Sequence, residues 1–130
     1  MPLAPPAPWP LLVVTSDFRR VDEVRRATTA WPVPVALRTA SNAIATLRHT
    51  LSRPTRLVIV DWAVDESNGQ ALVRLLGRVC PALPVLAFDG QGAGGPADPV
   101  LARPWDDLTT VLDGWLMLAL ERESARSGAS

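Results

Sequence analysis

Apolar residues recur along the chain in short runs separated by amphipathic stretches. Five runs of three or four residues are apolar on both sides of an extended chain, which is typical of strands buried in a parallel sheet. The strongest run is Leu-Val-Ile-Val at residues 57–60. The predicted strands cover residues 11–14, 34–37, 57–60, 85–88 and 100–102.

Between these runs the apolar residues follow helical spacing. Val21 and Val24 recur three residues apart after the first strand, with charged residues between them. Ser16 or Asp17 is placed to cap this helix, and Ser41 to cap the second, because their side-chain oxygens accept backbone N–H bonds. Similar spacing predicts further helices over residues 43–51, 72–79 and 108–119.

One helix is missing from this alternation. Residues 90–99 hold four Gly and two Pro, so they predict a loop instead of a regular helix. They contain G-x-G-x-x-G, but a dinucleotide site needs that loop after the first strand and directly before a helix, whereas Pro96 and Pro99 follow it here. The pattern predicts an α/β fold with a parallel sheet covered on both faces.

Charged residues follow four of the predicted strands. Asp17, Asp61 and Asp89 come just past the first, third and fourth strands, and Arg103 follows the fifth. Functional residues of parallel sheets lie at the carboxyl ends of the strands. We therefore expect these four side chains to converge on one edge of the sheet.

The composition fits one compact domain, with 48% hydrophobic residues in a chain of 130. Residues 1–10 carry five prolines and are predicted as a disordered lead-in, residues 11–123 as the domain, and residues 124–130 as a flexible tail. The formal net charge is zero, which gives no overall attraction to nucleic acid or an anionic membrane. No apolar run reaches the length of a membrane span.

Compartment and chemistry are also constrained by composition. The single Cys80 cannot form an internal disulfide, which fits a reducing compartment, and the start of the chain lacks the features of a signal peptide. A cytoplasmic location is therefore predicted. His49 is the only His, so no zinc site is expected. The sequence supplies no nucleophile–base pair, so no enzymatic activity is predicted.

Two segments resemble the receiver domains of two-component response regulators. Residues 57–62 (Leu-Val-Ile-Val-Asp-Trp), followed by Asn68-Gly69, resemble the family's third strand, with Asp61 in the position of the phospho-acceptor. Residues 102–105 (Ala-Arg-Pro-Trp) are similar to its Lys-Pro-aromatic turn. The resemblance implies a flavodoxin-like (βα)₅ fold, a doubly wound five-stranded parallel sheet, here with the fourth helix replaced or shortened to the Gly/Pro loop.

The chain departs from the receiver pattern at most switch positions. Thr15 and Ser16 stand where the family has the acidic pair that binds Mg²⁺, and Asp17 comes one position late. Asp89 replaces a Thr or Ser, and Arg103 replaces a Lys. These changes are expected to weaken Mg²⁺ binding and to oppose phosphorylation. Asp17 is interpreted as a helix cap or, together with Asp61, as a weak metal ligand, and no bound cofactor is predicted.

These departures lead to three hypotheses. The first is a degenerate receiver (pseudo-receiver) that acts in signal transduction by binding a protein or a second copy of itself without phosphorylation, with Arg103 paired to Asp61. Asp89 is interpreted either as a second partner of Arg103 or as a surface turn residue before Gly90. The second is an atypical response regulator phosphorylated at Asp61 by a histidine kinase. The third is a small-molecule-binding flavodoxin-like domain. Trp105 and Trp115 are interpreted as packing residues or as part of a partner interface.

Overall fold

The computed structural model describes residues 7–64, 68–90 and 102–128, with side chains described up to Arg126. Most of the predicted lead-in and of the Gly-rich loop lies outside the described residues. The same holds for Val100 and Leu101 of the predicted fifth strand.

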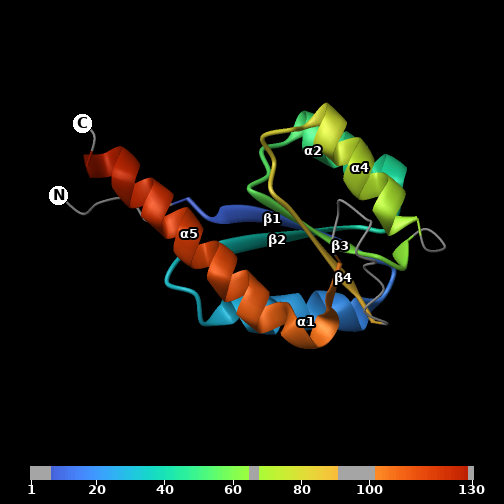
Figure 1. The fold of residues 1–130 in the computed structure, drawn as a ribbon, viewed down its shortest axis with the longest axis horizontal. Coiled ribbons are helices and arrows are strands. Elements are labelled where there is room, and N and C mark those ends of the chain that lie inside the picture. The colour runs from blue at the N-terminus through green and yellow to red at the C-terminus, as the bar shows by residue number, and fades with distance from the viewer. Residues whose placement is uncertain (1–6, 65–67, 91–101, 129–130) are drawn as a thin grey trace.

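A five-stranded, wholly parallel sheet forms the centre of the molecule (Figure 1). Its strand order, β2-β1-β3-β4-β5, is that of flavodoxin-like doubly wound sheets, so the predicted fold class is confirmed. All five residues of β3 are buried, as its continuous apolar run predicts. The strands are β1 (Trp9–Val14), β2 (Val35–Ala40), β3 (Leu57–Asp61), β4 (Val85–Asp89) and β5 (Arg103–Pro104).

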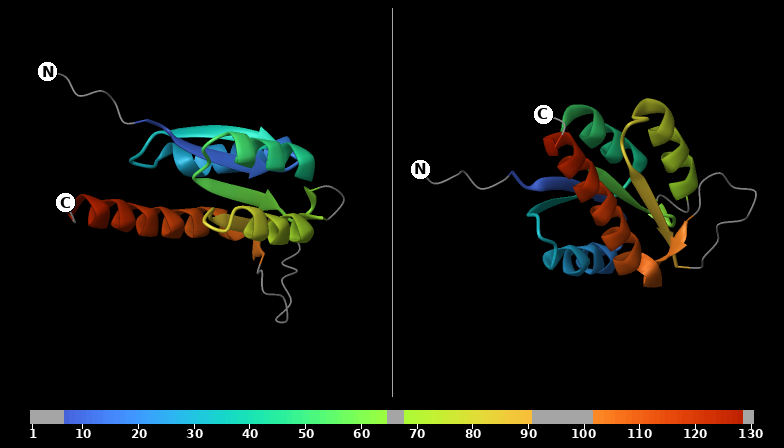
Figure 2. Two further views of the ribbon diagram at one scale, coloured as in Figure 1. Left: turned by 90° about the horizontal axis from the view of Figure 1, so that it is seen from above. Right: turned by 60° about the vertical axis from the view of Figure 1, so that its left-hand side comes forward.

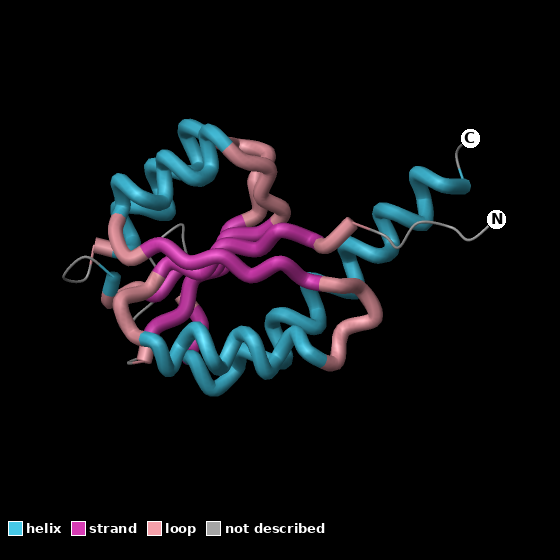
Figure 3. The backbone as a smooth tube through the Cα atoms, turned by 180° about the vertical axis from the view of Figure 1, so that it is seen from behind, coloured by secondary structure: helices cyan, strands magenta, loops and turns pink. Residues whose placement is uncertain are grey.

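Helices cover both faces of the sheet (Figures 1 and 3). On one face lie α1 (Phe18–Thr29) and α5 (Leu108–Gly128), which follows the short 3₁₀ turn η1 (Trp105–Asp107). On the other face lie α2 (Ala43–Ser52) and α4 (Gly69–Val79). Within the described residues no helix lies between β4 and β5, which agrees with a shortened connection there.

Alternate residues of the central strands feed two separate cores. Leu11 and Val13 of β1 pack in the cluster that includes residues of α1 and α5. Leu12 and Val14 belong to the cluster that includes residues of α4. Successive side chains of a strand point to opposite faces, and both faces are covered here, so every position must be apolar. This double coverage explains why β1 and β3 have no polar alternation.

The first strand starts earlier than the sequence predicts. Trp9 and Pro10, assigned to the disordered lead-in, open β1, and Trp9 is only 9% exposed. The backbone N–H of Trp9 donates to the carbonyl of Pro34 at 2.8 Å, which ties this end of β1 to the chain entering β2. The N-terminal boundary of the folded part therefore lies before residue 11.

Three further boundaries differ from the prediction. The second helix is capped by Asn42 instead of Ser41, because the Asn42 side chain accepts the N–H of Ala45 at 2.8 Å. The fifth strand is described as Arg103–Pro104, which pairs in register with Phe88 and Asp89, and Ala102 of the predicted strand does not belong to it. Helix α5 continues through the predicted tail to Gly128, and its last turns extend beyond the strands (Figures 1 and 2). No described helix combines the length and apolarity needed to cross a membrane.

Candidate functional site

Asp61 ends β3 at the carboxyl edge of the sheet, and only 6% of the residue is exposed. Its Oδ2 accepts a hydrogen bond from the Thr15 hydroxyl at 2.7 Å. Its Oδ1 accepts the backbone N–H of Ala63 at 3.1 Å. Both oxygens of this buried carboxylate are thus hydrogen-bonded inside the protein, as a buried charge requires.

Thr15 is the side chain that connects Asp61 to the first helix. Its Oγ1 donates to Asp61 and accepts the backbone N–H of Asp17 at 3.0 Å. Thr15 is 5% exposed, so both the donor and an acceptor site of its hydroxyl are used in a buried position. From the sequence, Thr15 was identified only as standing where the receiver family has an acidic residue. The signal for the contact was the parallel pairing of β1 with β3, which aligns Val14 with Val60 and so places the next residues side by side.

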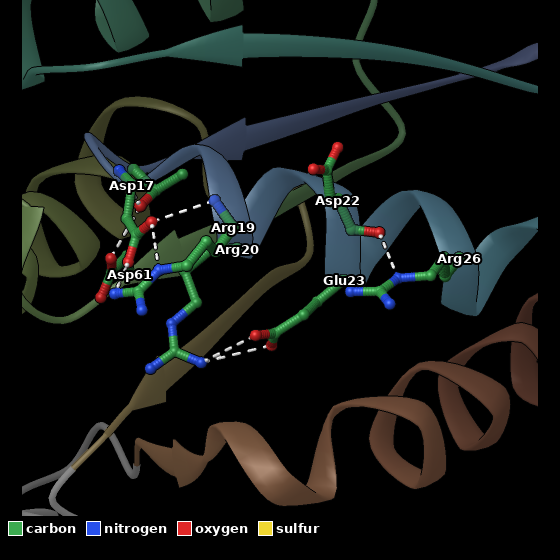
Figure 4. Close-up of polar contacts among 8 residues, drawn as sticks. Asp17, Arg19, Arg20, Asp22, Glu23, Arg26 and Asp61 are labelled. Atoms are coloured by element: carbon green, nitrogen blue, oxygen red, sulfur yellow. Dashed lines mark hydrogen bonds and ion pairs between the residues drawn. The ribbon is translucent and has the colours of Figure 1, made fainter.

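Asp17 caps α1, as one of the two sequence interpretations held. Its Oδ1 accepts the backbone N–H of Arg19 at 3.0 Å, and its Oδ2 lies 3.0 Å from the Arg19 guanidinium (Figure 4). The side-chain bond from Arg19 and the backbone N–H of the same residue hold the pKa of Asp17 below its ordinary value. Both oxygens of the Asp17 carboxylate are therefore occupied by contacts with Arg19 in the first turn of α1.

The receiver fold implies a Mg²⁺ centre at this edge, and the residues do not fit one. Mg²⁺ takes oxygen ligands in near-octahedral geometry, usually carboxylates, phosphate and water. Here Asp61 accepts from a hydroxyl and an amide, Asp17 is bound to Arg19, and Thr15 and Ser16 are neutral. Among the described residues no group of three or more His, Cys, Asp and Glu side chains could hold a metal ion.

Arg103 does not make the predicted ion pair with Asp61. Its Nη2 lies 3.3 Å from Oδ2 of Asp107 in η1, and both side chains are largely exposed, at 56% and 43%. Two strand spacings, about 10 Å, separate β5 from β3, and the chain turns into η1 directly after Arg103. The carboxylate four residues along is therefore nearer than Asp61. Asp89 lies half-buried at the end of β4, and the ion pair of Arg103 is not with it either.

Arg20 is a cation near this edge that the sequence analysis missed. Its guanidinium binds Glu23 at 3.1 Å (Figure 4). The same guanidinium lies 4.7 Å from the centre of the Trp105 ring. A Cβ on Gly90 would lie 3.5 Å from Nη2 of Arg20, which places this arginine beside the chain leaving β4. In the sequence Arg20 is one of several polar residues of an amphipathic helix. The contact of Arg20 with Trp105 depends on how α1 packs, and the local sequence pattern does not predict that packing.

Gly69 packs against the backbone that carries the candidate acceptor. A Cβ at this position would lie 2.6 Å from Cα of Trp62 and 2.8 Å from the carbonyl oxygen of Asp61. These are backbone atoms, which cannot move aside as a flexible side chain can. Only glycine lets α4 begin this close to the end of β3. The receiver resemblance at Asn68-Gly69 therefore has a steric reason in this chain.

The two tryptophans proposed as interface residues both have packing roles. Trp105 is 5% exposed and stacks on Phe88 with ring centroids 5.1 Å apart. Trp115 is half-buried on α5, stacks on Trp31 at 6.1 Å and meets Trp9 edge-on at 6.0 Å. Aromatic pairs in these geometries stabilise cores beyond the area they bury. A partner interface at these residues remains a prediction.

Comparison with solved structures gives close matches of fold. The signal receiver domain of an HD domain-containing protein from Pseudomonas fluorescens Pf-5 matches with a TM-score of 0.65 at 22% identity, over 92% of this chain and 99% of that one. The non-phosphorylated receiver domain of RcsB from Escherichia coli gives a TM-score of 0.67 at 14% identity, over 90% and 95%. A CheY-like receiver domain protein from Methanospirillum hungatei JF-1 gives 0.66 at 14% identity, over 89% and 99%.

These matches share the fold with this chain at low sequence identity. No protein-family profile matches the sequence. No curated protein matches it either. The chain therefore has the receiver fold, and its function has to be argued from its own side chains.

Proposed function

We propose that this chain, which has the fold of response-regulator receiver domains, acts in signal transduction by binding a protein without being phosphorylated. The observation that carries the proposal is the buried bond from the Thr15 hydroxyl to Asp61 Oδ2. It replaces a metal-binding acid by a neutral donor and engages one oxygen of the acceptor carboxylate. Asp61 then serves as a structural residue that joins β3 to β1.

Phosphoryl transfer to Asp61 would lack its electrostatic support in this arrangement. Such a transfer needs positive charge close to the oxygens of the transferring group. Arg103 is directed to Asp107 and Arg20 to Glu23, so the described cations near this edge already have carboxylate partners. Thr15 and Ser16 offer no charge at all. The site therefore favours a fixed domain over a phosphate-operated switch.

Beryllofluoride, which imitates a phosphoryl group on Asp, provides the test. The ¹⁵N–¹H spectrum of the wild-type chain is recorded with Mg²⁺ while beryllofluoride is added, and Asp61→Asn serves as the matched control. We expect the same small, scattered shifts in both proteins. Shifts that cluster around Asp61 and Arg103 in the wild type and vanish in Asp61→Asn would overturn the proposal in favour of an atypical regulator phosphorylated at Asp61.

That second candidate has one observation in its favour. Asp61 stands at the carboxyl end of β3, and the N–H of Ala63 donates to it, so an acceptor carboxylate is in place. A third candidate, a small-molecule site over the Gly-rich loop, concerns residues 91–99, which lie outside the described part. The first function is the one that the contacts of Asp61 support best.

A further inference from the structure

A groove lies at the amino ends of β3 and β4, the opposite edge of the sheet from Asp61. Three segments far apart in sequence line it: residues 50–56 at the end of α2 and in the connection to β3, residues 80–84 between α4 and β4, and residues 115–126 of α5. Its volume is about 690 Å³. Ligand sites typically measure about 300–1,000 Å³, so the groove is large enough to hold part of another molecule.

The lining of the groove combines apolar and charged side chains. Pro54, Leu83 and Pro84 contribute from the two connections, and Trp115 and Leu118 from α5. Leu118 leaves 58% of its surface exposed although it belongs to an apolar run on α5. Apolar side chains beside a concave surface gain stability when a ligand removes them from water.

The charges around the groove are strongly one-sided. Four arginines and one glutamate line it, in a protein whose net charge is zero. Arg56 is paired with Glu123, and its guanidinium lies 3.6 Å from the centre of the Trp9 ring, so this pair is held in place. The remaining three lining arginines are exposed: Arg53, Arg122 and Arg126. Among the described residues, no carboxylate forms an ion pair with any of these three.

Two of these arginines are arranged at a cost to the helix. Arg122 and Arg126 are four residues apart, so they are neighbours on one side of α5, and like charges at this spacing repel. The C-terminus of a helix favours positive charge, which accounts for Arg126 in the last turn. The same preference accounts for Arg53, which is the C-cap residue of α2, and two helix ends therefore bring their positive charges to this groove. An anionic ligand between the three would relieve the repulsion.

We propose that this groove binds an acidic, apolar segment of a partner protein. The carboxylates of that segment pair with Arg53, Arg122 and Arg126, and its apolar side chains cover Leu118 and Trp115. Nucleic acid fits less well, because the apolar side chains of Leu118 and Trp115 gain nothing from a phosphate backbone. This inference rests on the proposed function, to which it gives a binding surface.

Selection from a displayed library of short random peptides tests the proposal without assuming a partner. We expect the wild-type chain to enrich sequences that combine Asp or Glu with Leu, Phe or Trp. The affinity of the enriched peptides, measured by fluorescence anisotropy, should fall about tenfold or more in Arg122→Glu and in Arg126→Glu. Both side chains are exposed, so neither change disturbs a packed core.

Arg38→Glu is the matched control, because Arg38 is exposed on the edge strand β2 and does not line the groove. Unchanged peptide binding by this variant supports the proposal. Failure to enrich acidic peptides overturns the proposal. Enriched peptides that bind the groove variants Arg122→Glu and Arg126→Glu as tightly as the control Arg38→Glu also overturn it. Tighter groove-dependent binding of a single-stranded oligonucleotide or of phosphatidylglycerol vesicles also overturns it.

The outcomes separate this inference from the proposed function. A beryllofluoride response at Asp61 would contradict phosphorylation-independent action. It would not affect a finding that peptides bind in the groove. Absence of groove-dependent binding would reject the groove and leave the inert state of Asp61 unaffected. The two sites lie at opposite ends of β3, so neither set of variants interferes with the other readout.

Discussion

Thr15 and Asp61 lie just past β1 and at the end of β3, neighbouring strands, and a buried hydrogen bond of 2.7 Å joins their side chains. The bond crosses 46 residues of sequence. It is the contact that fixes the candidate acceptor in this protein, and it can be removed without changing side-chain volume.

Thr15→Val is expected to lower the free energy of unfolding by about 1–3 kcal/mol, because it leaves Asp61 Oδ2 without its buried donor. Urea denaturation measures the change. Thr15→Ser keeps a hydroxyl and should recover much of the loss. In an Asp61→Leu background the valine substitution should cost far less, and equal costs in both backgrounds would mean that the two side chains are not coupled.

Gly69→Ala is expected to destabilise the domain by about 1–3 kcal/mol, because the new methyl group would lie 2.6 Å from Cα of Trp62. Gly77→Ala on the same helix is the control. A Cβ at Gly77 meets nothing within 4 Å, so alanine there should stabilise α4 by about 0.5–1 kcal/mol. Thermal unfolding of the two variants should therefore shift in opposite directions, and a parallel shift would contradict the close approach at Gly69.

Arg103→Ala is expected to change the free energy of unfolding by less than about 1 kcal/mol, since its ion pair with Asp107 is largely exposed. The pairing predicted from the sequence would instead have left buried carboxylates without a partner and cost several times more. Chemical denaturation separates the two. A loss near 3 kcal/mol would restore the predicted pair with Asp61.

Trp115→Ala is expected to cost about 2–3 kcal/mol, because it removes a half-buried ring that contacts both Trp31 and Trp9. Trp115→Phe keeps an aromatic ring and should cost clearly less. Chemical denaturation measures both variants. Unchanged stability in the alanine variant would contradict a packing role for the ring.

Asp17 should give the domain an acid-dependent stability. Hydrogen bonds from Arg19 hold its folded pKa below the ordinary 3.8, so its charged form stabilises the fold. This contribution is fully present above the unfolded pKa and is lost as the pH falls through the folded pKa. The difference in Tm between wild type and Asp17→Asn should therefore be constant at neutral pH and shrink below about pH 4. A difference that does not vary with pH would contradict the charge effect.

Local pattern was enough for the alternation of strands and helices, and the resemblance to receiver domains implied the flavodoxin-like sheet. The apolar run of β3, the helical spacing of Val21 and Val24 and the cap at Asp17 are each properties of a few adjacent residues. Hydrophobic periodicity reports such features directly, and the right-handed crossover rule then leaves few ways to assemble them. The same reasoning placed Asp61 at the carboxyl edge of the sheet.

The partners of the charged side chains depended on tertiary structure. Arg103 pairs with Asp107 because the chain turns into η1 directly after β5. The site of Arg20 follows from the packing of α1 near Trp105, and the basic groove forms only where three distant segments meet. The sequence by itself thus determined the sheet and the place of Asp61. Tertiary structure decided what Asp61 binds, because that contact depends on strand register over 46 residues.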